Sequence, residues 1–354
     1  MGLRLCSKEA VLPFIEMVIS ILAQVSSMEI TKIALSQGMN RYVIIVYSDI
    51  IATLVLLPCC LIVHRSERPP LTFPIICGFF VLGLSGCLAN FFGYAGINLS
   101  SPTLGTAMLN LVPGLTFILA VAFRMEKLNW RTSSTLAKSI GTIVSVGGAF
   151  ILTYYKGPPV LMTPPLNTSH GLLVQLSNWV IGGLLLAVDC VMTSSWVIIQ
   201  AFILKKYPAE LIVVFFYCFF VTIQSAIVCL IIERDPSAWS LRPNIRLVAV
   251  LYSGVFGSAF QVGICSWCLR QTGPVFISMF KPLGIVIAAA VGILFLGDTL
   301  YLGCLAGATV IVIGFYSVLW GKANEQKMGI DAGAKTIESS SQKVPLLQGY
   351  IEEI

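Results

Sequence analysis

Lys281 and Pro282 stand side by side in an apolar run that extends from Pro274 to Asp298. At a rise of about 1.5 Å per residue, Lys281 would lie about 10 Å inside a helix that begins at Pro274. A charge at the centre of a bilayer costs at least about 2.5–3.5 kcal/mol, and proline leaves a backbone carbonyl without its helical partner. Broken helices at membrane depth are tolerated where they line a cavity. The pair therefore predicts a polar binding surface inside a membrane.

Two acidic residues in other apolar runs, Asp49 and Asp189, are candidate partners for Lys281. A buried ion pair that only fixes helix packing would explain all three residues. Contact with a ligand or ion would also explain them. The sequence leaves both interpretations open.

The composition makes the membrane setting necessary. The chain has 354 residues, of which 57% are hydrophobic and 11% are charged, whereas a soluble domain carries about 25% charged residues. Its basic residues are scattered over loops, so we expect no nucleic-acid partner. Cys265 and Cys268 form a C-x-x-C pair with no histidine nearby, which favours packing over metal or redox chemistry. We expect no metal site and no cofactor.

Apolar stretches of about 20 residues predict membrane-spanning helices. We expect ten spans, at residues 12–35, 42–63, 72–97, 102–123, 133–154, 178–204, 209–232, 245–269, 274–296 and 300–320. The first 11 residues precede them. A Pro- and Gly-rich loop at 155–177 separates two five-helix halves, 12–154 and 178–320, and the polar tail 321–354 is expected to be disordered.

Lys and Arg gather at one set of helix ends, which predicts cytosolic N- and C-termini. This arrangement places the sequon at Asn167 in the long non-cytosolic loop, where glycosylation is possible.

An internal repeat relates the two halves. "GLSGCLAN" begins at Gly83 and "GVFGSAFQ" at Gly254, and they end on the amides Asn90 and Gln261. Further on, Glu126 follows Pro102 and Asp298 follows Pro274, each after 24 residues. Halves of five spans enter the membrane from opposite sides, so the pattern predicts an inverted repeat, as in many secondary transporters. The predicted fold is an all-α polytopic membrane protein of two such five-helix bundles.

The paired positions of the two halves are 171 or 172 residues apart, which places Leu109 and Asn110 at the positions equivalent to Lys281 and Pro282, and Pro113 follows one turn later. Helix breaks are therefore expected at Pro113 and Pro282. An amide, a cation and freed backbone would suit a ligand with a carboxylate. Further candidate substrate contacts, with interhelical packing as the alternative for each, are Asn90, Gln261, Asp189 and, for stacking, Trp267. Glu126 and Asp298 are expected to be gate or cap residues.

The segments "FRMEKL" and "MFKPLGIV", the proline-led spans around them and a late "VPLL" resemble the plant nodulin-21-like, EamA-type transporters. This group is also known as the Walls-Are-Thin-related or UMAMIT family, within the drug/metabolite transporter superfamily. The resemblance runs from Val11 to Lys322. One departure is Leu109, where a second polar residue is expected before Asn110.

The resemblance implies ten helices from a duplicated five-helix unit. It also implies alternating-access movement of amino acids or related small organic solutes, in some members auxin, across the plasma or vacuolar membrane, in many members in both directions. We expect a monomer that contacts lipid and a small-molecule solute. A dimer and proton coupling are left open, and the solute cannot be named.

Two other classes of membrane protein need features that this sequence lacks. An intramembrane enzyme would use Asp49 and Asp189 as an aspartyl pair, but no G-x-G-D motif accompanies them. A receptor or scaffold would need a recognisable domain, which the short loops and tail do not provide.

The site assignment predicts that Lys281→Ala abolishes saturable amino-acid uptake or efflux in oocytes or vesicles, because the buried cation is lost. Surface expression should persist and serves as the control. Unchanged transport would remove Lys281 from the site.

Overall fold

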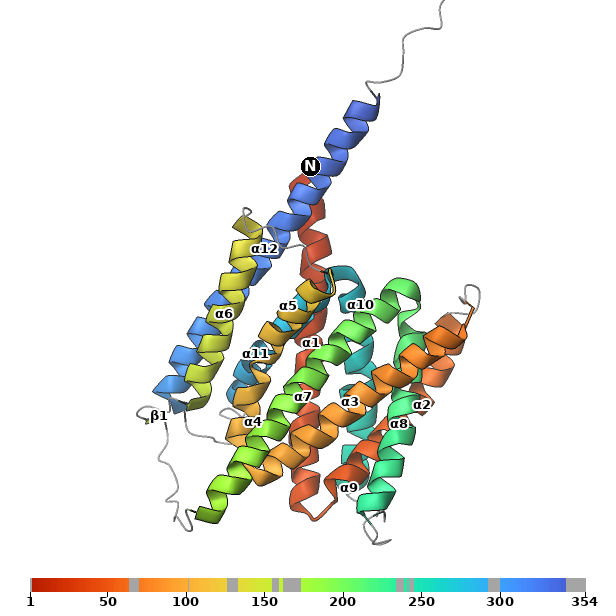
Figure 1. Cartoon of the computed structure of the whole chain (residues 1–354), viewed down its shortest axis with the longest axis vertical. Coiled ribbons are helices and arrows are strands. Elements are labelled where there is room, and N and C mark those ends of the chain that lie inside the picture. The colour runs from red at the N-terminus through yellow and green to blue at the C-terminus, as the bar shows by residue number, and fades with distance from the viewer. Residues whose placement is uncertain are drawn as a thin grey trace, which may run out of the picture.

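Helices follow one another along most of the chain in the computed structural model (Figure 1). The residues that the structure describes are 2–63, 70–100, 102–125, 133–154, 159–161, 173–233, 239, 241, 245–291 and 300–341. The helices are α1 (Gly2–Ser36), α2 (Arg41–Val63), α3 (Phe73–Leu99), α4 (Pro102–Leu109), α5 (Val112–Ala122), α6 (Ser133–Tyr154), α7 (Leu173–Lys206), α8 (Glu210–Ile232), α9 (Ile245–Tyr252), the π-helix η2 (Ser253–Phe260), α10 (Gln261–Thr272), α11 (Pro274–Val291) and α12 (Leu302–Ser341).

Among the described residues, six stretches of helix are long and apolar enough to cross a membrane. They are Leu12–Ser36, Arg41–Val63, Phe73–Leu99, Val180–Lys206, Glu210–Ile232 and Ile245–Thr272. Shorter apolar helices cover Val112–Ala122 and Leu305–Gly321. The all-helical membrane fold is thus confirmed, while the number of ten spans and their inverted repeat stay predictions.

The fourth predicted span is divided between α4 and α5, with Asn110 and Leu111 in the turn that joins them. Pro113 lies in the first turn of α5, where proline is well tolerated because its missing N–H has no helical partner. The predicted break at Pro282 is wrong, because α11 continues through Pro282. Neighbouring helices can compensate for one lost backbone bond in such a span.

Two other expectations differ from the structure. A short strand, β1 (Pro159–Leu161), forms in the linker and pairs antiparallel with β2 (Leu300–Tyr301), which joins the linker to the start of α12. The tail that we expected to be disordered is helical as far as Ser341, since Lys, Ala, Glu, Gln and Met are good helix formers.

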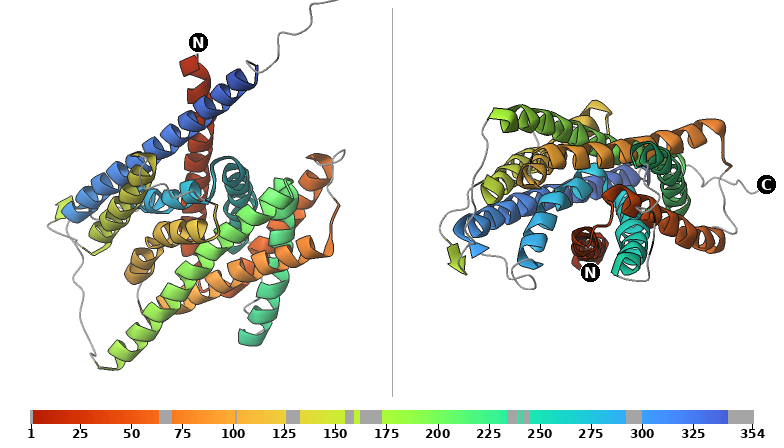
Figure 2. Two further views of the ribbon diagram at one scale, coloured as in Figure 1. Left: turned by 45° about the horizontal axis from the view of Figure 1, so that its top comes forward. Right: turned by 90° about the horizontal axis from the view of Figure 1, so that it is seen from below.

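Glycines bring α6 and α12 into close contact along their length, and Figures 1 and 2 show the two helices side by side. A Cβ added to Gly148 would lie 2.7 Å from the backbone nitrogen of Ile311, and one on Gly141 would lie 2.7 Å from the carbonyl oxygen of Gly314. Lipid supplies no hydrophobic force between helices, so such small residues allow the close packing that holds them together.

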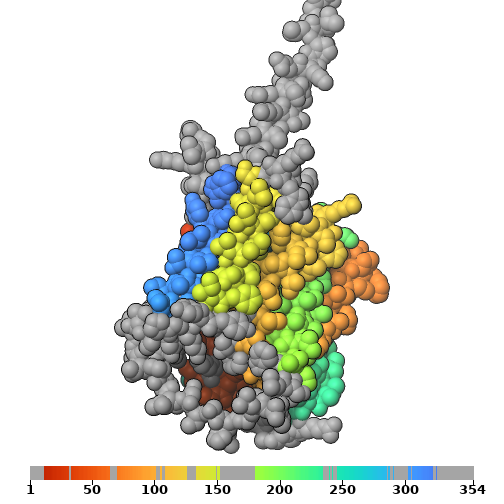
Figure 3. Space-filling model, turned by 60° about the vertical axis from the view of Figure 1, so that its left-hand side comes forward, coloured from red at the N-terminus to blue at the C-terminus, as the bar shows by residue number. Residues whose placement is uncertain are grey.

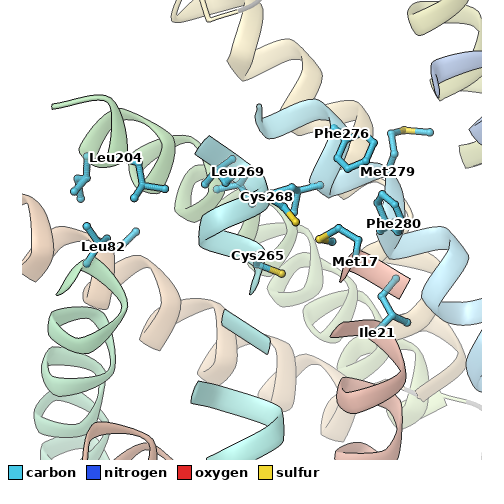
Figure 4. Close-up of a cluster of buried hydrophobic side chains, with 14 of the residues drawn as sticks. Met17, Ile21, Leu82, Leu204, Cys265, Cys268, Leu269, Phe276, Met279 and Phe280 are labelled. Carbon is cyan, nitrogen blue, oxygen red and sulfur yellow. The ribbon is translucent and has the colours of Figure 1, made fainter. Parts of the chain in front are cut away.

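One large apolar cluster, here named the terminal core, fills the end of the bundle at which α1 begins (Figure 4). It combines side chains mainly from α1, α3, the end of α7, the start of α8, the end of α10, the start of α11 and α12. Members include Met17, Ile21, Leu82, Leu204, Cys265, Cys268, Leu269, Phe276, Met279 and Phe280. Phe280 and Phe315 pack edge-to-face at 4.9 Å between ring centroids, which ties α11 to α12. This end of the bundle is therefore tightly packed.

The α6–α12 contact predicts unequal effects at two adjacent glycines. Gly148→Ala should lower the free energy of unfolding by about 1–3 kcal/mol, because the new methyl group meets backbone that cannot move freely. Gly147→Ala is the control, since its Cβ would meet nothing within 4 Å. Thermal unfolding in detergent measures both, and equal midpoints for the two variants would contradict the packing described.

Candidate functional site

The carboxylate of Asp189 lies in the interior of the bundle, at the middle of α7. Its side chain is 7% exposed, and its Oδ1 accepts a hydrogen bond of 3.2 Å from Thr193 one turn later. Opposite it stands Gly93 of α3, where an added Cβ would come within 2.9 Å of Asp189 Oδ2. The missing side chain at Gly93 therefore makes the room that Asp189 occupies.

Lys281 of α11 lies close enough to Asp189 for the two charges to attract one another. The two groups are too far apart for a direct ion pair, and within the described part of the chain the ammonium of Lys281 has no hydrogen-bond or ion-pair partner. Asp49, the other candidate partner, instead accepts a hydrogen bond from Ser258. A half-buried cation and a buried carboxylate thus face the same region without neutralising one another directly.

Asn110 lies at the break between α4 and α5 and is fully buried, at 0% exposed. Two side chains of α7 hold this break: Cys190 Sγ donates to the Met108 carbonyl at 3.0 Å, and Ser194 Oγ donates to the Val112 carbonyl at 3.3 Å. Between these bonds, neither the nitrogen nor the oxygen of the Asn110 amide has a partner among the described residues. A buried amide without partners is costly, which suggests that a ligand or water completes it.

Asn90 is exposed on a face of α3 that is otherwise covered. It shares one face of α3 with Gly86 and Gly93, at spacings of four and three residues. Both glycines are covered: an added Cβ on Gly86 would lie 2.6 Å from Tyr217 Oη of α8, and Gly93 faces Asp189 of α7. Asn90 is nevertheless exposed. The exposure of Asn90 indicates accessible space beside α7 and α8. Figure 3 shows α12, α6 and α5 side by side on another face of the molecule.

Asp49 of α2 is also buried, and its Oδ1 accepts a hydrogen bond of 3.3 Å from Ser258. Ser258 belongs to η2, a π-helix that sequence reasoning missed although it contains the repeated "GVFGSAFQ" segment. π-Helical turns are frequent at functional sites. In the sequence, only the two glycines of this segment set it apart. In the structure, an added Cβ on Gly254 would lie 2.7 Å from Ile51 of α2.

Gln261 and Trp267 contact other parts of the bundle. Gln261 Nε2 donates to Cys265 Sγ of its own helix at 3.5 Å, and its carbonyl accepts from Ser20 of α1. Trp267 is partly buried against the terminal core. Glu126, Asp298 and Asn167 lie outside the described residues, and so their predicted roles stay predictions.

The site has no grouping typical of metal binding. Within the ranges that the structure describes, no three His, Cys, Asp or Glu side chains gather closely enough to hold a metal ion. Its chemistry is that of an amide, a carboxylate and an ammonium arranged about a helix break.

Comparison with known proteins relates the chain to one group of membrane transporters. The model of the EamA-like transporter family matches residues 180–320. The chain is 45% identical to the WAT1-related protein At3g28050 of Arabidopsis thaliana over 96% of both chains. It is 44% identical to the WAT1-related protein At5g40240 of the same plant, over 97% of this chain and 94% of the relative. One solved crystal structure shares the fold at 16% identity, with a TM-score of 0.65, covering 88% of this chain and 96% of the other.

The orphaned amide predicts an unusual stability change. Asn110→Leu should raise the free energy of unfolding by about 1–3 kcal/mol, because it removes buried polar atoms that have no partner. Asn40→Leu is the control and should destabilise, since Asn40 Nδ2 donates to Glu233 and its Oδ1 accepts from the Tyr42 backbone N–H at 2.9 Å. Thermal unfolding without added solute checks both. A less stable Asn110→Leu protein would mean that the amide is already satisfied.

Proposed function

The chain belongs to the WAT1-related family of EamA-like transporters, and on that basis we propose that it moves amino acids or related small organic acids by alternating access. It is an integral multi-pass membrane protein and a transporter rather than an enzyme. We further propose that it works as a facilitator in both directions. Auxin-like acids belong to the same proposed class of solute.

The observation that carries this proposal is the interior group of Asp189, Lys281 and Asn110. An α-amino acid carries an ammonium and a carboxylate a few ångströms apart. Asp189 would take the ammonium, while Lys281 and the amide of Asn110 would take the carboxylate. Because Lys281 and Asp189 attract one another without a direct ion pair, a zwitterion placed between them would satisfy both charges.

Helix packing supports the inverted repeat and the ten spans. If α1 corresponds to α7, α2 to α8 and α3 to the continuous α9–η2–α10 segment, several of the main contacts have counterparts. α3 packs on α7 as α10 packs on α1, and α3 packs on α8 as η2 packs on α2. The pairs α2–α8, α5–α11 and α6–α12 would lie on the axis that relates the halves. Two such halves can open one central site to either side with similar energies.

The two ends of the bundle differ in a way that alternating access requires. The terminal core, with the Arg270–Glu210 ion pair at 2.5 Å, closes the end at which α1 begins. Asn90 marks an opening nearer the other end. We propose that this conformation receives solute from the end opposite the N-terminus, which is the non-cytosolic side if both termini are cytosolic.

Several finer features belong to the same proposal. Asn90, Gln261 and Trp267 would contact solute on its way through, and Glu126 and Asp298 would act as gate or cap residues. The protein would work as a monomer in the plasma or vacuolar membrane, with Asn167 available for glycosylation. Asp49, buried beside Ser258, is the candidate for proton coupling.

The alternatives have less support. An aspartyl enzyme would need Asp49 and Asp189 to share a proton, yet each accepts from a different hydroxyl group, Ser258 and Thr193. A receptor or scaffold would not need an interior carboxylate, ammonium and amide.

The test is counterflow in proteoliposomes that contain unlabelled L-glutamine and receive labelled L-glutamine outside. The wild-type protein should accumulate label transiently. Asp189→Asn should reduce the initial rate at least about tenfold, since a charge-assisted hydrogen bond is lost. Gly93→Ala should raise KM, because the new methyl group displaces the Asp189 carboxylate.

Gly263→Ala is the matched control, because its added Cβ would meet nothing within 4 Å. Folding of each variant is checked by its elution as a single species in detergent. Failure of the wild-type protein to exchange any proteinogenic amino acid in a full panel would refute the proposed solute class.

A further inference from the structure

Arg41 differs from two other arginines that lie at the ends of described helices. Arg246 Nη2 donates to the Gln37 carbonyl at 2.5 Å, and Arg270 Nη1 donates to Glu210 at 2.5 Å and to the Pro208 carbonyl at 2.8 Å. Arg41 instead lies over the ring of Tyr94, with 4.7 Å between its Cζ and the ring centroid. Among the described residues, its guanidinium has no carboxylate or carbonyl partner.

The neighbouring residues hold Arg41 in place. Tyr42, the next residue of α2, stacks on Phe91 of α3 with 5.3 Å between ring centroids and 13° between ring planes. This stack fixes the start of α2 on the last turns of α3, and Arg41 is only partly exposed there. The guanidinium is therefore oriented by the fold, unlike that of a freely hydrated surface arginine.

Arg41 stands at the entrance to the interior group of charges. Tyr94, which it covers, lies within Coulombic range of Asp49 and Asp189 as well as of Arg41. One turn from Tyr94 on the same face of α3 is Asn90, which borders the opening. A solute that enters from this end therefore meets a fixed cation first and two carboxylates deeper in the bundle.

The chemistry of a stacked guanidinium decides what it can bind. Stacking uses the face of the planar group and leaves its N–H edges free, and two parallel N–H groups match the two oxygens of a carboxylate. Cation–π contact with the ring stabilises the guanidinium without consuming these donors.

We propose that Arg41, held on Tyr94, is an entry site for solutes with a free carboxylate. The inference rests on the proposed function and fixes the orientation in which the amino acid binds. Its carboxylate contacts Arg41 and its ammonium points inward to Asp189, whose charge would repel the carboxylate. As the solute moves inward, Asp189 keeps the ammonium and the carboxylate passes from Arg41 to Lys281 and Asn110.

The first test compares Arg41→Gln with Arg246→Gln, an arginine at the same end that is already engaged by Gln37. Arg41→Gln should raise KM for L-glutamine about three- to tenfold in the direction in which solute enters at this end. The maximal rate in that direction should stay unchanged, and the ratio of maximal rate to KM should fall by the same factor in both directions, because a passive facilitator cannot favour one direction. Arg246→Gln should alter none of these. Equal effects of the two variants, or no change in KM for Arg41→Gln, would overturn the proposal.

The second test does not depend on transport. Purified full-length protein is treated with phenylglyoxal, and modification of Arg41 and Arg246 is followed by mass spectrometry. L-Glutamine should protect Arg41, whereas L-glutaminamide, which has no carboxylate, should not. Arg246 should react alike in both. Protection of Arg41 in a protein that moves no amino acid would refute the proposed function alone. Transport without protection of Arg41 would refute the entry site alone.

Discussion

Ionisable side chains inside apolar helices cannot face lipid cheaply, and this constraint organises the structure. A charge at the bilayer centre costs at least about 2.5–3.5 kcal/mol, so Asp49, Asp189 and Lys281 must turn inward. They come from α2, α7 and α11 and approach one region beside α3. The bundle therefore needs a polar interior whichever solute it binds.

Glycines solve two different problems in this bundle. On α3 they leave room for polar groups: Gly93 admits the carboxylate of Asp189 and Gly86 admits the hydroxyl of Tyr217. Between α6 and α12 they allow backbone to touch backbone, as at Gly141 and Gly314. The first set shapes the site, while the second ties the last helix of each predicted half to the other. The same residue type thus serves recognition in one place and cohesion in another.

Much of this could be predicted from the sequence, because the cost of burying charge can be read from residue types. It led to Lys281, to Asp189 as its neighbour and to the break at Asn110. The π-helix was missed, since an extra residue per turn leaves no periodic signal in an apolar run. The continuous α11 at Pro282 depends on neighbours that a single segment does not reveal. The role proposed for Arg41 depends on its contact with Tyr94, and in the sequence a charge at a helix end indicates only topology.

The central claim is that a water-accessible gap lies between α7 and α8 and reaches the interior charges. Its most direct test is the labelling of Asn90→Cys with a water-soluble, membrane-impermeant thiol reagent, compared with Leu84→Cys on the exposed apolar face of α3. Mapping of labelled peptides by mass spectrometry separates these sites from the native cysteines. The account predicts rapid labelling at position 90, slowed by L-glutamine, and little labelling at position 84. Labelling of neither position, or equal labelling of both without protection by solute, would contradict it.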